Sequence, residues 1–588
     1  MLALAATARA GDAPGIVQQP ENSMLQVGST LQLSCVVTGT PPISYIWRRD
    51  QVFLSDQTNA TLVITNAQQP DSGRYLLAAA NDYGITQSAP AQVVVDTLPP
   101  CYYPPTWVAL YSNSEVVTNA YGRLPWDAAV DMAVDKRGNV IIGGFSINFD
   151  SPGDRFYLTA KYDPNGGLAW VRNHYGDGGN QAAVEAVTVD DSGNVYVTGY
   201  SYALRPPMEG DNDCVTIKYD CNGNQLWLAR FNSPGNGHDR GLDVEVDGVG
   251  NCYVTGVSAT IKYDANGDEQ WVVPCSGEAL KLSPTGDSLY VASKSGPCSG
   301  LQKYATNGET LWVKGMPATY YWGKGFLTVD GEGNAYVTGH NGTSPWITEQ
   351  AETTKFGPDG QQLWSVLYEG QCARARVEWL TVDKSGAVYI VGSTSVPSTP
   401  PGSDAFVVKY DAAGNKVWEA LFDGPAHIED TASNVAVDDQ GHLLVTVCSS
   451  TSDNSVGYGM ILKYDLNGNL LWSSLLANAG PFSSQGGYVT LAVDGAGNVY
   501  AAAGANSQSA WTVKLEQHEP RLGAHGLFGG AFLGCLASEM GGVYTVKASD
   551  DLRTWTPVET VTNINGLIPF HDFKASESAH RFYRAEGL

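Results

Sequence analysis

The chain has 588 residues, more than one hydrophobic core usually supports, so the sequence predicts several domains. Only 16% of the residues are charged, while 66 glycines, 30 tyrosines and 15 tryptophans are typical of an all-β protein with many turns. The formal net charge of −26, with no cluster of lysine or arginine, argues against nucleic acid as a partner because phosphates would be repelled. No apolar run reaches the length of a transmembrane segment; the closest, 526–537, suits a pair of strands.

Residues 1–14 resemble the end of a secretory signal and are otherwise expected to be disordered. Ala8-Arg9-Ala10 matches the small-x-small pattern of a cleavage site. Together with the types of domain that follow, this segment predicts a protein that is secreted or held at the cell surface.

Residues 15–96 alternate apolar and polar positions with turns at strand-length intervals. They contain Cys35 on an apolar strand, Trp47 on the next one, and the phrase Asp71-Ser-Gly-Arg-Tyr75. The pattern resembles an immunoglobulin-like domain with its core tryptophan and tyrosine corner. The resemblance departs at Leu77, where the second core cysteine would stand. We therefore expect no inter-sheet disulfide and a buried Cys35 thiol packed against Trp47 and Leu77.

Residues 97–105 are proline-rich and predict a stiff linker. The following segment, 106–517, is built from one recurring unit, which is clearest at 186–231. The unit contains four runs rich in Val, Thr, Tyr and Ile, with Asp-x-x-Gly-Asn turns at 190–194 and 220–224. Because Gly and Asn accept the positive φ of a tight hairpin, each unit predicts a four-stranded antiparallel sheet.

The first turn of this unit occurs eight times, a regularity that predicts an eight-bladed β-propeller. Its copies begin at Asp135, Asp190, Asp247, Ser283, Asp330, Asp383, Asp438 and Asp494. The last turn is followed by a strand that contains Trp170, Trp227, Trp271, Trp312, Trp364, Trp418 or Trp472. Runs such as Val195-Tyr-Val-Thr are apolar on both faces, as expected of strands sandwiched between neighbouring blades.

The repeats resemble the SBBP-type β-propeller repeats of bacteria, and their Asp-x-x-Gly-Asn-x-Tyr-Val phrase is similar to the NHL repeat. The resemblance implies a bacterial protein in which the Val-Asp run is the innermost strand of each blade. The Tyr-Val-Thr-Gly, Lys-Tyr-Asp and Trp strands would follow outward. It implies little about activity, because propellers host many unrelated functions.

The two ends of the repeat region complement each other. Trp107–Tyr111 matches an outer Trp strand that lacks inner strands, and Trp511-Thr-Val-Lys-Leu matches a third strand that lacks an outer one. We expect Trp107–Tyr111 to supply the outer strand of the last blade, so that no sheet edge stays open there.

Residues 518–588 contain Ser549-Asp-Asp-Leu-Arg-Thr-Trp555 and end with Arg581-Phe-Tyr-Arg584. These motifs resemble a small β-sandwich module at the C-termini of exported bacterial multidomain proteins. An anchoring, sorting or capping role is compatible with that resemblance.

The 10 cysteines show no C-x-x-C pair of a zinc site. Cys275 and Cys298 flank the shortest repeat, and they either form a disulfide or are buried separately as small apolar residues.

No motif predicts a cofactor, a metal or catalysis. The loop from Asp264 to Asp268 has part of a calcium-binding spacing but lacks the terminal bidentate Glu, so we expect a turn without metal. The Asp-x-x-Gly-x-x-x-Trp phrase is similar to the tryptophan-docking motif of quinoprotein dehydrogenases. Those enzymes commonly carry a vicinal cysteine pair, which this sequence lacks, and the motif also has a purely architectural interpretation.

The candidate binding site lies where the connections vary in length. The Asp-x-x-Gly turns share one face of the disc, whereas the second-to-third-strand links and the blade-to-blade links share the opposite one. Variable loops on a rigid scaffold commonly bind ligands, although they can also be merely tolerant of insertion. We expect the short third and fourth blades to leave a notch in this rim. The candidate contacts are Tyr202, Arg205, His238, Arg240, Tyr320, Tyr321, Trp322, Trp346, Arg374 and Arg376.

The sequence thus favours an exported, monomeric, non-enzymatic interaction protein that binds a glycan or a protein. One alternative is an enzyme at the propeller axis, either a quinoprotein-like oxidoreductase or a polysaccharide-active enzyme. Another is a purely structural surface protein.

Overall fold

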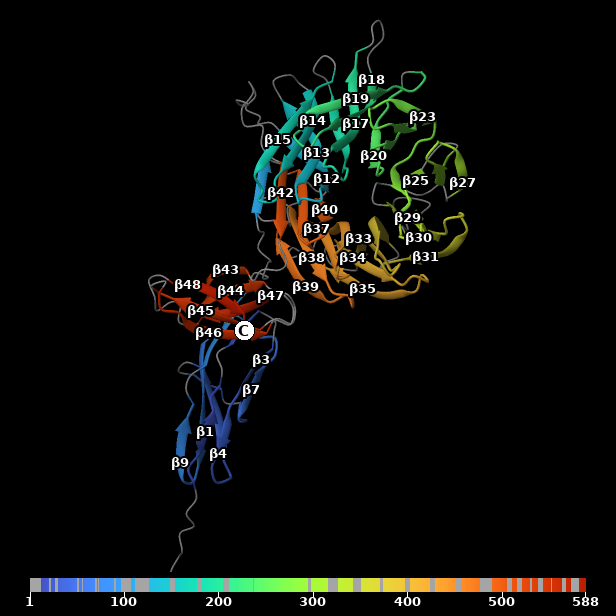
Figure 1. Cartoon of the computed structure of the whole chain (residues 1–588). Helices are drawn as coiled ribbons and strands as arrows, with labels where there is room; N and C mark the ends of the chain where they lie inside the picture. Colours follow the sequence, from blue (N-terminus) through green and yellow to red (C-terminus); the bar gives the residue numbers. More distant parts are fainter. Residues whose placement is uncertain are drawn as a thin grey trace, which may run out of the picture. The chain divides into compact units, whose positions relative to one another are not determined.

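The computed structural model shows an all-β chain, with no α-helix among the residues it describes. Those residues are 12–20, 23–26, 30–49, 52–54, 57–68, 71, 73–88, 91–96, 107–111, 126–148, 154–176, 181–204, 211–235, 237–293, 298–315, 326–341, 350–370, 374–396, 402–423, 429–450, 457–475, 489–504, 510–515, 521–528, 531–537, 543–550, 553–562, 567–572 and 581–587. The chain forms two compact units, Tyr103–His518 and the remainder, Met1–Tyr102 with Glu519–Leu588 (Figure 1).

The N-terminal part is an immunoglobulin-like sandwich, as predicted. Its strands are β1 (Gly15–Gln18), β2 (Ser23–Gln26), β3 (Leu31–Ser34), β4 (Val36–Thr38), β5 (Ser44–Arg49), β6 (Val52–Leu54), β7 (Thr61–Ile64), β8 (Gly73–Asn81), β9 (Gly84–Gln87) and β10 (Ala91–Asp96). They pair in the orders β2-β10-β8-β5-β6, with β9 on β8, and as the pairs β3-β7 and β1-β4. Alternate residues of β3 are buried, so one face of this strand points into the core.

The core of this sandwich matches the expectation for Cys35. Cys35 is a free, buried thiol in the same apolar cluster as Trp47 and Leu77. Burial raises the pKa of its thiol to about 11, although a hydrogen bond with Ser88 opposes the shift. The tyrosine corner is present as well, because the Tyr75 hydroxyl donates to the carbonyl oxygen of Asp71 at 2.6 Å.

The second unit is a propeller of eight four-stranded sheets among the described residues. In blade 1 the strands are β12 (Trp126–Val134), β13 (Val140–Asn148), β14 (Asp154–Tyr162) and β15 (Leu168–His174); in blade 2, β16 (Ala182–Val189), β17 (Val195–Ala203), β18 (Asp211–Tyr219) and β19 (Gln225–Phe231); in blade 3, β20 (Gly241–Val246), β21 (Cys252–Gly256), β22 (Thr260–Tyr263) and β23 (Glu269–Val273); in blade 4, β24 (Ala279–Leu282), β25 (Ser288–Ser293), β26 (Gly300–Ala305) and β27 (Thr310–Lys314).

The remaining blades repeat the pattern. Blade 5 contains β28 (Leu327–Val329), β29 (Ala335–Asn341), β30 (Gln350–Phe356) and β31 (Gln362–Tyr368); blade 6, β32 (Ala375–Val382), β33 (Val388–Val396), β34 (Gly402–Tyr410) and β35 (Lys416–Phe422); blade 7, β36 (Asp430–Val437), β37 (Leu443–Ser450), β38 (Gly457–Tyr464) and β39 (Leu470–Leu475); blade 8, β40 (Val489–Val493), β41 (Val499–Gly504), β42 (Ala510–Leu515) and β11 (Trp107–Tyr111).

The first strand of each blade lies innermost. Each first strand contacts the first strand of the next blade, and β40 contacts β12, so the ring is closed. Figure 1 shows β15, β23, β27, β31 and β35 at the periphery and β12, β20 and β40 nearer the centre. The predicted order of strands from the axis outward is therefore confirmed.

The last blade is completed by the strand that precedes the first one in sequence. Strand β11 pairs antiparallel with β42, with Trp107 opposite Lys514 and Tyr111 opposite Ala510. The order β11-β42-β41-β40 makes β11 the outer strand of blade 8, as the sequence predicted. Pairing between the two ends of the repeat region holds the ring closed without a further connection.

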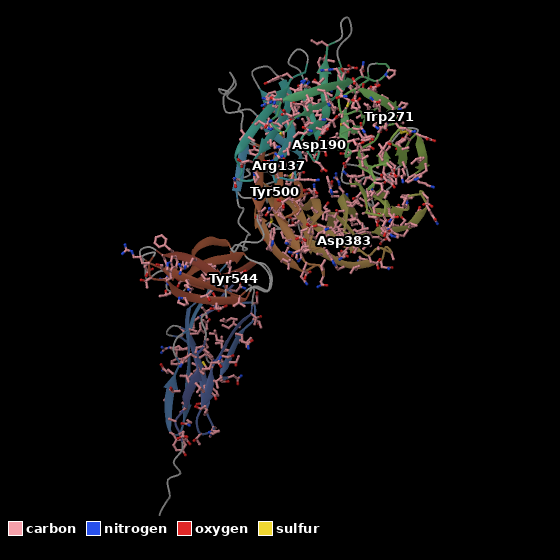
Figure 2. All side chains as sticks on the ribbon, viewed as in Figure 1. Arg137, Asp190, Trp271, Asp383, Tyr500 and Tyr544 are labelled. Atoms are coloured by element: carbon pink, nitrogen blue, oxygen red, sulfur yellow. A yellow bond between two sulfur atoms is a disulfide. The ribbon has the colours of Figure 1, made fainter. Side chains whose placement is uncertain are left out.

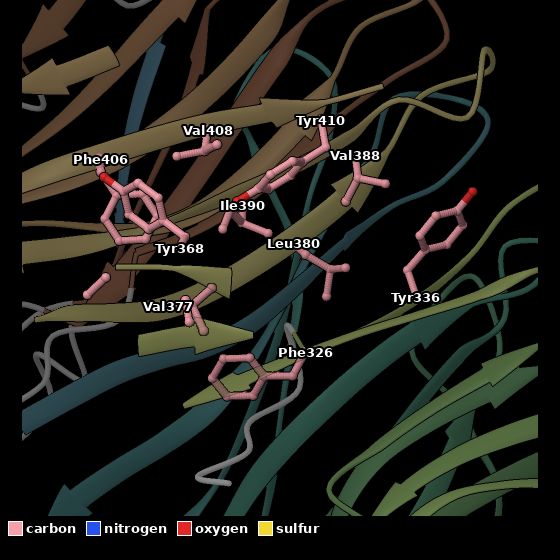
Figure 3. Packing of buried hydrophobic residues seen from close by; sticks show 12 residues of the cluster. Phe326, Tyr336, Tyr368, Val377, Leu380, Val388, Ile390, Phe406, Val408 and Tyr410 are labelled. Atoms are coloured by element: carbon pink, nitrogen blue, oxygen red, sulfur yellow. The ribbon is translucent and has the colours of Figure 1, made fainter. Parts of the chain in front are cut away.

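Apolar side chains fill the spaces between blades. Between blades 5 and 6, Tyr336 and Tyr368 come from one sheet, and Val377, Ile390 and Phe406 come from the next (Figure 3). The middle strands β33 and β34 are buried on both faces over most of their length, which explains why these parts of the repeat lack the apolar–polar alternation of half-exposed strands.

The C-terminal part is a small sandwich of two three-stranded sheets, as predicted. The first sheet has the order β43-β44-β47 and the second β46-β45-β48. The strands are β43 (Arg521–Phe528), β44 (Ala531–Ala537), β45 (Val543–Ser549), β46 (Thr556–Thr562), β47 (Leu567–Asp572) and β48 (Phe582–Gly587). Leu536 and Phe570 from the first sheet pack against Val546 from the second.

One question that the sequence left open is answered within blade 4. Cys275 and Cys298 form a disulfide, with their Cα atoms 5.9 Å apart. Cys275 precedes β24 and Cys298 precedes β26, so the bridge lies at the variable-loop end of this blade.

Candidate functional site

A ligand-binding site could lie on either face of the propeller. On the face with the tight turns, most polar side chains make contacts that hold the fold together. In seven of the eight first turns the leading aspartate organises its own loop, and in blade 4 Ser283 stands in its place. Asp190 accepts hydrogen bonds from the backbone N–H groups of Ser192 and Asn194 and from the Asn194 side-chain amide, at 2.8–3.0 Å. The Tyr196 hydroxyl donates to the same carboxylate at 3.1 Å. These aspartates therefore serve the turn, in the manner of an Asx turn.

The recurring tryptophans join neighbouring blades. Six of the seven donate from indole Nε1 at 3.0–3.1 Å to a carbonyl oxygen in the last turn of the next blade: Trp170 to Cys221, Trp227 to Ala265, Trp271 to Thr306, Trp312 to Pro358, Trp364 to Ala412 and Trp418 to Leu466. A Cβ at Gly223 would lie 2.8 Å from the Trp170 ring, so the glycine of the turn lets the indole dock. Figure 2 shows Trp271 at the periphery and Asp190 and Asp383 nearer the axis. These contacts favour the architectural interpretation of the motif.

The lysines of the third strands are also engaged between strands or blades. Lys161 lies 3.1 Å from the Asp135 carboxylate, and Lys463 lies 2.9 Å from Asp438, with all four side chains buried. Burial opposes ionisation of Asp438, but hydrogen bonding with His442 and the Lys463 ammonium outweigh it and hold the pKa of Asp438 well below its usual value. These ion pairs stabilise the fold.

The tight-turn face still has two hollows. One, of about 480 Å³, lies between the first turns of blades 8 and 1 and is lined by Asp135, Lys136, Arg137 and Asp494, among others. The second, of about 430 Å³, lies between the first turns of blades 2 and 3. Both mix the two signs of charge, and the leading aspartates of their turns are already bonded within those turns.

The opposite face differs from blade to blade. Strands β17 and β18 have nine residues each, whereas β21 has five and β22 has four. A β-strand rises about 3.3 Å per residue, so the strands of blade 3 end about 13 Å short of those of blade 2 on this face. Strands β25 and β26 of blade 4 are intermediate, with six residues each. The expected lowering of the rim at blades 3 and 4 follows from these lengths.

Half of the predicted contacts lie on described residues. Tyr202 is half-buried on β17, and His238 is exposed just before β20. Arg240 forms an ion pair with Glu185 of blade 2. Arg376 at the start of β32 is 64% exposed and lies 2.8 Å from Glu378, and the Arg374 carbonyl accepts a hydrogen bond from Thr394.

The other predicted contacts, Arg205, Tyr320, Tyr321, Trp322 and Trp346, lie outside the described residues. The described ones fall into two groups. Tyr202, His238 and Arg240 belong to the junction of blades 2 and 3, whereas Arg374 and Arg376 belong to blade 6.

Sequence reasoning missed the aromatic and basic residues around Arg240. The guanidinium carbon of Arg240 lies over the Tyr200 ring, 4.9 Å from the ring centroid. The Tyr200 hydroxyl accepts a hydrogen bond from Arg155 at 3.0 Å. Arg155 in turn stacks on the Phe145 ring at 3.7 Å. Comparing equivalent positions of the repeats could have singled out Arg155, because the third strand of blade 2 has Asn212 at that place.

One group of carboxylates has a geometry that could hold a cation. Oxygen atoms of Asp404, Asp423 and Asp430 lie within 4.8 Å of one another at the junction of blades 6 and 7. Each of these residues also has another interaction. The loop from Asp264 to Asp268 is a hairpin turn. Its Asp264 carboxylate accepts hydrogen bonds from the backbone N–H groups of Asn266 and Asp268 at 2.9 and 3.0 Å.

Fold and site together define a repeat-built propeller protein with an immunoglobulin-like domain. A family model described as an immunoglobulin domain matches residues 13–81, and one described as a β-propeller repeat, SBBP, matches residues 170–204. The SBBP resemblance is thus confirmed for that segment. The NHL likeness and the bacterial origin stay predictions.

Two curated relatives illustrate the similarity. The uncharacterized WD repeat-containing protein L264 of Acanthamoeba polyphaga mimivirus is 23% identical over 433 residues, which cover 55% of this chain and 30% of that protein. Roundabout homolog 1 of Rattus norvegicus is 38% identical over 78 residues, covering 12% of this chain and 5% of that protein. The chain thus spans less than a third of either relative.

Among solved structures, rhamnogalacturonan lyase YesW is 14% identical with a TM-score of 0.37, covering 84% of this chain and 90% of that chain. A likeness this low carries no argument about function. Within the described residues, no helix is long and apolar enough to cross a membrane.

Proposed function

We propose that this protein is a secreted or cell-surface interaction protein whose propeller binds a glycan or a protein through the variable-loop face, without catalysis. The observation that carries the proposal is that the two faces differ in how their side chains are used. The repeated aspartates, lysines and tryptophans of the tight-turn face bond to their own turns or to neighbouring blades. On the opposite face, strand length and side chains differ from blade to blade, which is the usual property of a binding surface on a rigid scaffold.

Two further observations support an extracytoplasmic site of action. The disulfide between Cys275 and Cys298 is of a kind that persists in oxidising compartments. The immunoglobulin domain match covers residues 13–81, and such modules commonly act in recognition or as spacers. The monomeric state and the glycan or protein nature of the ligand belong to the same proposal.

The test is a binding screen of the intact chain against a glycan array and a panel of extracellular proteins, followed by matched variants. Arg240→Gln with Arg376→Gln changes the variable-loop face. Lys136→Ala with Arg137→Ala changes exposed side chains of the tight-turn hollow and is the control. We expect the first pair to weaken binding at least about tenfold, or ~1.4 kcal/mol, and the control to leave it unchanged.

Two results contradict the proposal. If only the control variant weakens binding, the ligand site belongs to the tight-turn face. If candidate ligands are consumed and not merely bound, the protein is an enzyme. Unfolding temperatures of both variants show whether the fold is intact.

A further inference from the structure

A group of side chains at the variable-loop ends of blades 1, 2 and 3 has a composition that the fold does not require. We call Phe145, Arg155, Glu185, Tyr200 and Arg240 the arginine cluster. Phe145 and Arg155 come from β13 and β14, Tyr200 and Glu185 from β17 and β16, and Arg240 from the start of blade 3. Arg155 stacks on Phe145 at 3.7 Å and donates to the Tyr200 hydroxyl at 3.0 Å, while Arg240 lies over the Tyr200 ring at 4.9 Å.

The five side chains of the arginine cluster have a net charge of +1, from two arginines and one glutamate. Arg240 is paired with Glu185, so these two charges balance. Among the described side chains, Arg155 forms no ion pair, and one of its N–H groups donates to the Tyr200 hydroxyl. A half-buried arginine with no acidic partner among the described side chains is notable in a chain with 60 acidic and 34 basic residues. A planar guanidinium has several N–H donors, and the contact with Tyr200 uses one of them.

The repeat itself does not explain Arg155. This residue stands six positions before Lys161 of its strand, and the equivalent positions before Lys218 and Lys409 are Asn212 and Ser403. Strands β18 and β34 pair with their neighbours over nine residues with these shorter side chains. A stacked arginine is therefore not a general requirement of the repeat.

We propose that Arg155, with Tyr200 and Arg240, forms a subsite for a single carboxylate group of the ligand. A guanidinium matches a carboxylate with two parallel hydrogen bonds, and one net positive charge suits a monoanion better than a polyanion. Stacking on Phe145 and bonding to Tyr200 hold Arg155 in place before binding, so little side-chain entropy is lost. A sugar acid and an acidic amino-acid side chain supply the same group. This inference rests on the proposed function.

The experiment measures how fast phenylglyoxal modifies individual arginines of the intact chain, by mass spectrometry. The probes are glucuronate and N-acetylglutamate amide, with glucose and N-acetylglutamine amide as neutral counterparts. Arg137 is the internal control, because it is exposed on the tight-turn face. For a Kd of about 1 mM, we expect ~10 mM of an effective acid to slow Arg155 modification about tenfold while Arg137 is unaffected.

Protection by only one of the two acids identifies the source of the carboxylate. The inference fails if neither acid protects Arg155, if the neutral compounds protect equally, or if Arg137 is protected to the same extent. Tyr200→Phe removes only the hydroxyl, and we expect it to weaken protection severalfold with an unchanged unfolding temperature. Unchanged protection in this variant would remove Tyr200 from the subsite.

The outcome is separable from that of the proposed function. If the screen finds a ligand on the variable-loop face and Arg155 stays unprotected, the binding platform stands and the carboxylate subsite falls. If Arg155 is protected but the screen finds no ligand whose binding is weakened by the variants of the variable-loop face, the carboxylate subsite is supported and the proposed binding platform is not.

Discussion

The indole nitrogen of Trp170 in blade 1 donates to the carbonyl oxygen of Cys221 in blade 2 at 3.1 Å. This bond joins the outer strand of one sheet to the last turn of the next, and five more blade junctions repeat it. Blade 8 has no turn between its third and outer strands, because β42 and β11 come from opposite ends of the repeat region. The ring is therefore held by docked indoles at six junctions and by strand pairing in blade 8.

We expect Trp170→Ala to destabilise the propeller by about 3–5 kcal/mol, because it removes a buried indole and its interblade hydrogen bond. Leu168→Ala, on the same strand but 53% exposed, is the control and should cost less than about 1 kcal/mol. Urea unfolding followed by intrinsic fluorescence and circular dichroism measures both. Equal losses in the two variants would show that the docked indole does not stabilise the ring.

The closing strand gives a second prediction. Replacing residues 107–111 by a Gly-Ser segment of equal length should leave the outer edge of β42 unpaired. We expect loss of cooperative unfolding or aggregation, measured by calorimetry and light scattering. Val108→Ile keeps a β-branched residue in the strand and should behave like the parent chain. Unfolding of the Gly-Ser variant like the intact chain would rule out closure by β11.

Cys35 gives a prediction about reactivity. Its buried thiol has a pKa of about 11, so very little thiolate is present at pH 8. We expect a disulfide-exchange reagent to label Cys35 only when the immunoglobulin-like domain unfolds. Cys221, which is partly exposed, should react earlier in the same sample. Mass spectrometry of labelled peptides separates the two sites, and labelling of Cys35 within seconds in the native protein would contradict the packing of its two sheets.

The buried carboxylate of Asp438 predicts a dependence of stability on pH. Its pKa is lower in the folded chain than the usual value of about 3.9 in an unfolded one. The ionised form therefore stabilises the fold above about pH 4, and this contribution is lost as the pH falls toward the folded-state pKa. We expect Asp438→Asn to cost about 2 kcal/mol or more at pH 7 and distinctly less at pH 3, measured by urea unfolding.

Asp439→Asn is the matched control for that experiment. Asp439 is the next residue, 59% exposed, and it pairs with Lys384, which is 86% exposed. An exposed pair of this kind contributes about 0–1 kcal/mol. The interpretation of the Asp438–Lys463 pair fails if both variants lose the same stability, or if the loss in Asp438→Asn does not shrink on acidification.

Local sequence was sufficient for most of the fold. The eight first turns are visible because a tight hairpin needs Gly or Asn with positive φ, as at Gly193 with φ of 83°. The closing strand could be matched to its blade because the Trp strand and the Lys strand each carry their own pattern. Leu77, standing where a cysteine was expected, was enough to predict a free thiol at Cys35.

The candidate site was predictable only in part. The variable-loop face follows from loop lengths, and Arg240 was named as a candidate contact from the sequence. Its partners Glu185 and Tyr200 were not foreseen, because neither has an unusual sequence neighbourhood. Arg155 was not named either, although a comparison of the third strands, with Asn212 at its place in blade 2, could have singled it out.

What the sequence by itself determined is what depends on spacing along the chain: the number of blades, the order of strands in each sheet, and the face that carries the tight turns. What only the tertiary structure decided depends on which side chains meet between blades. Arg155 and Tyr200 are 45 residues apart, and Arg240 and Glu185 are 55 apart, yet each pair is in contact. The disulfide between Cys275 and Cys298 was equally undecided by pattern, because it requires a Cα–Cα separation that only the folded blade sets, here 5.9 Å.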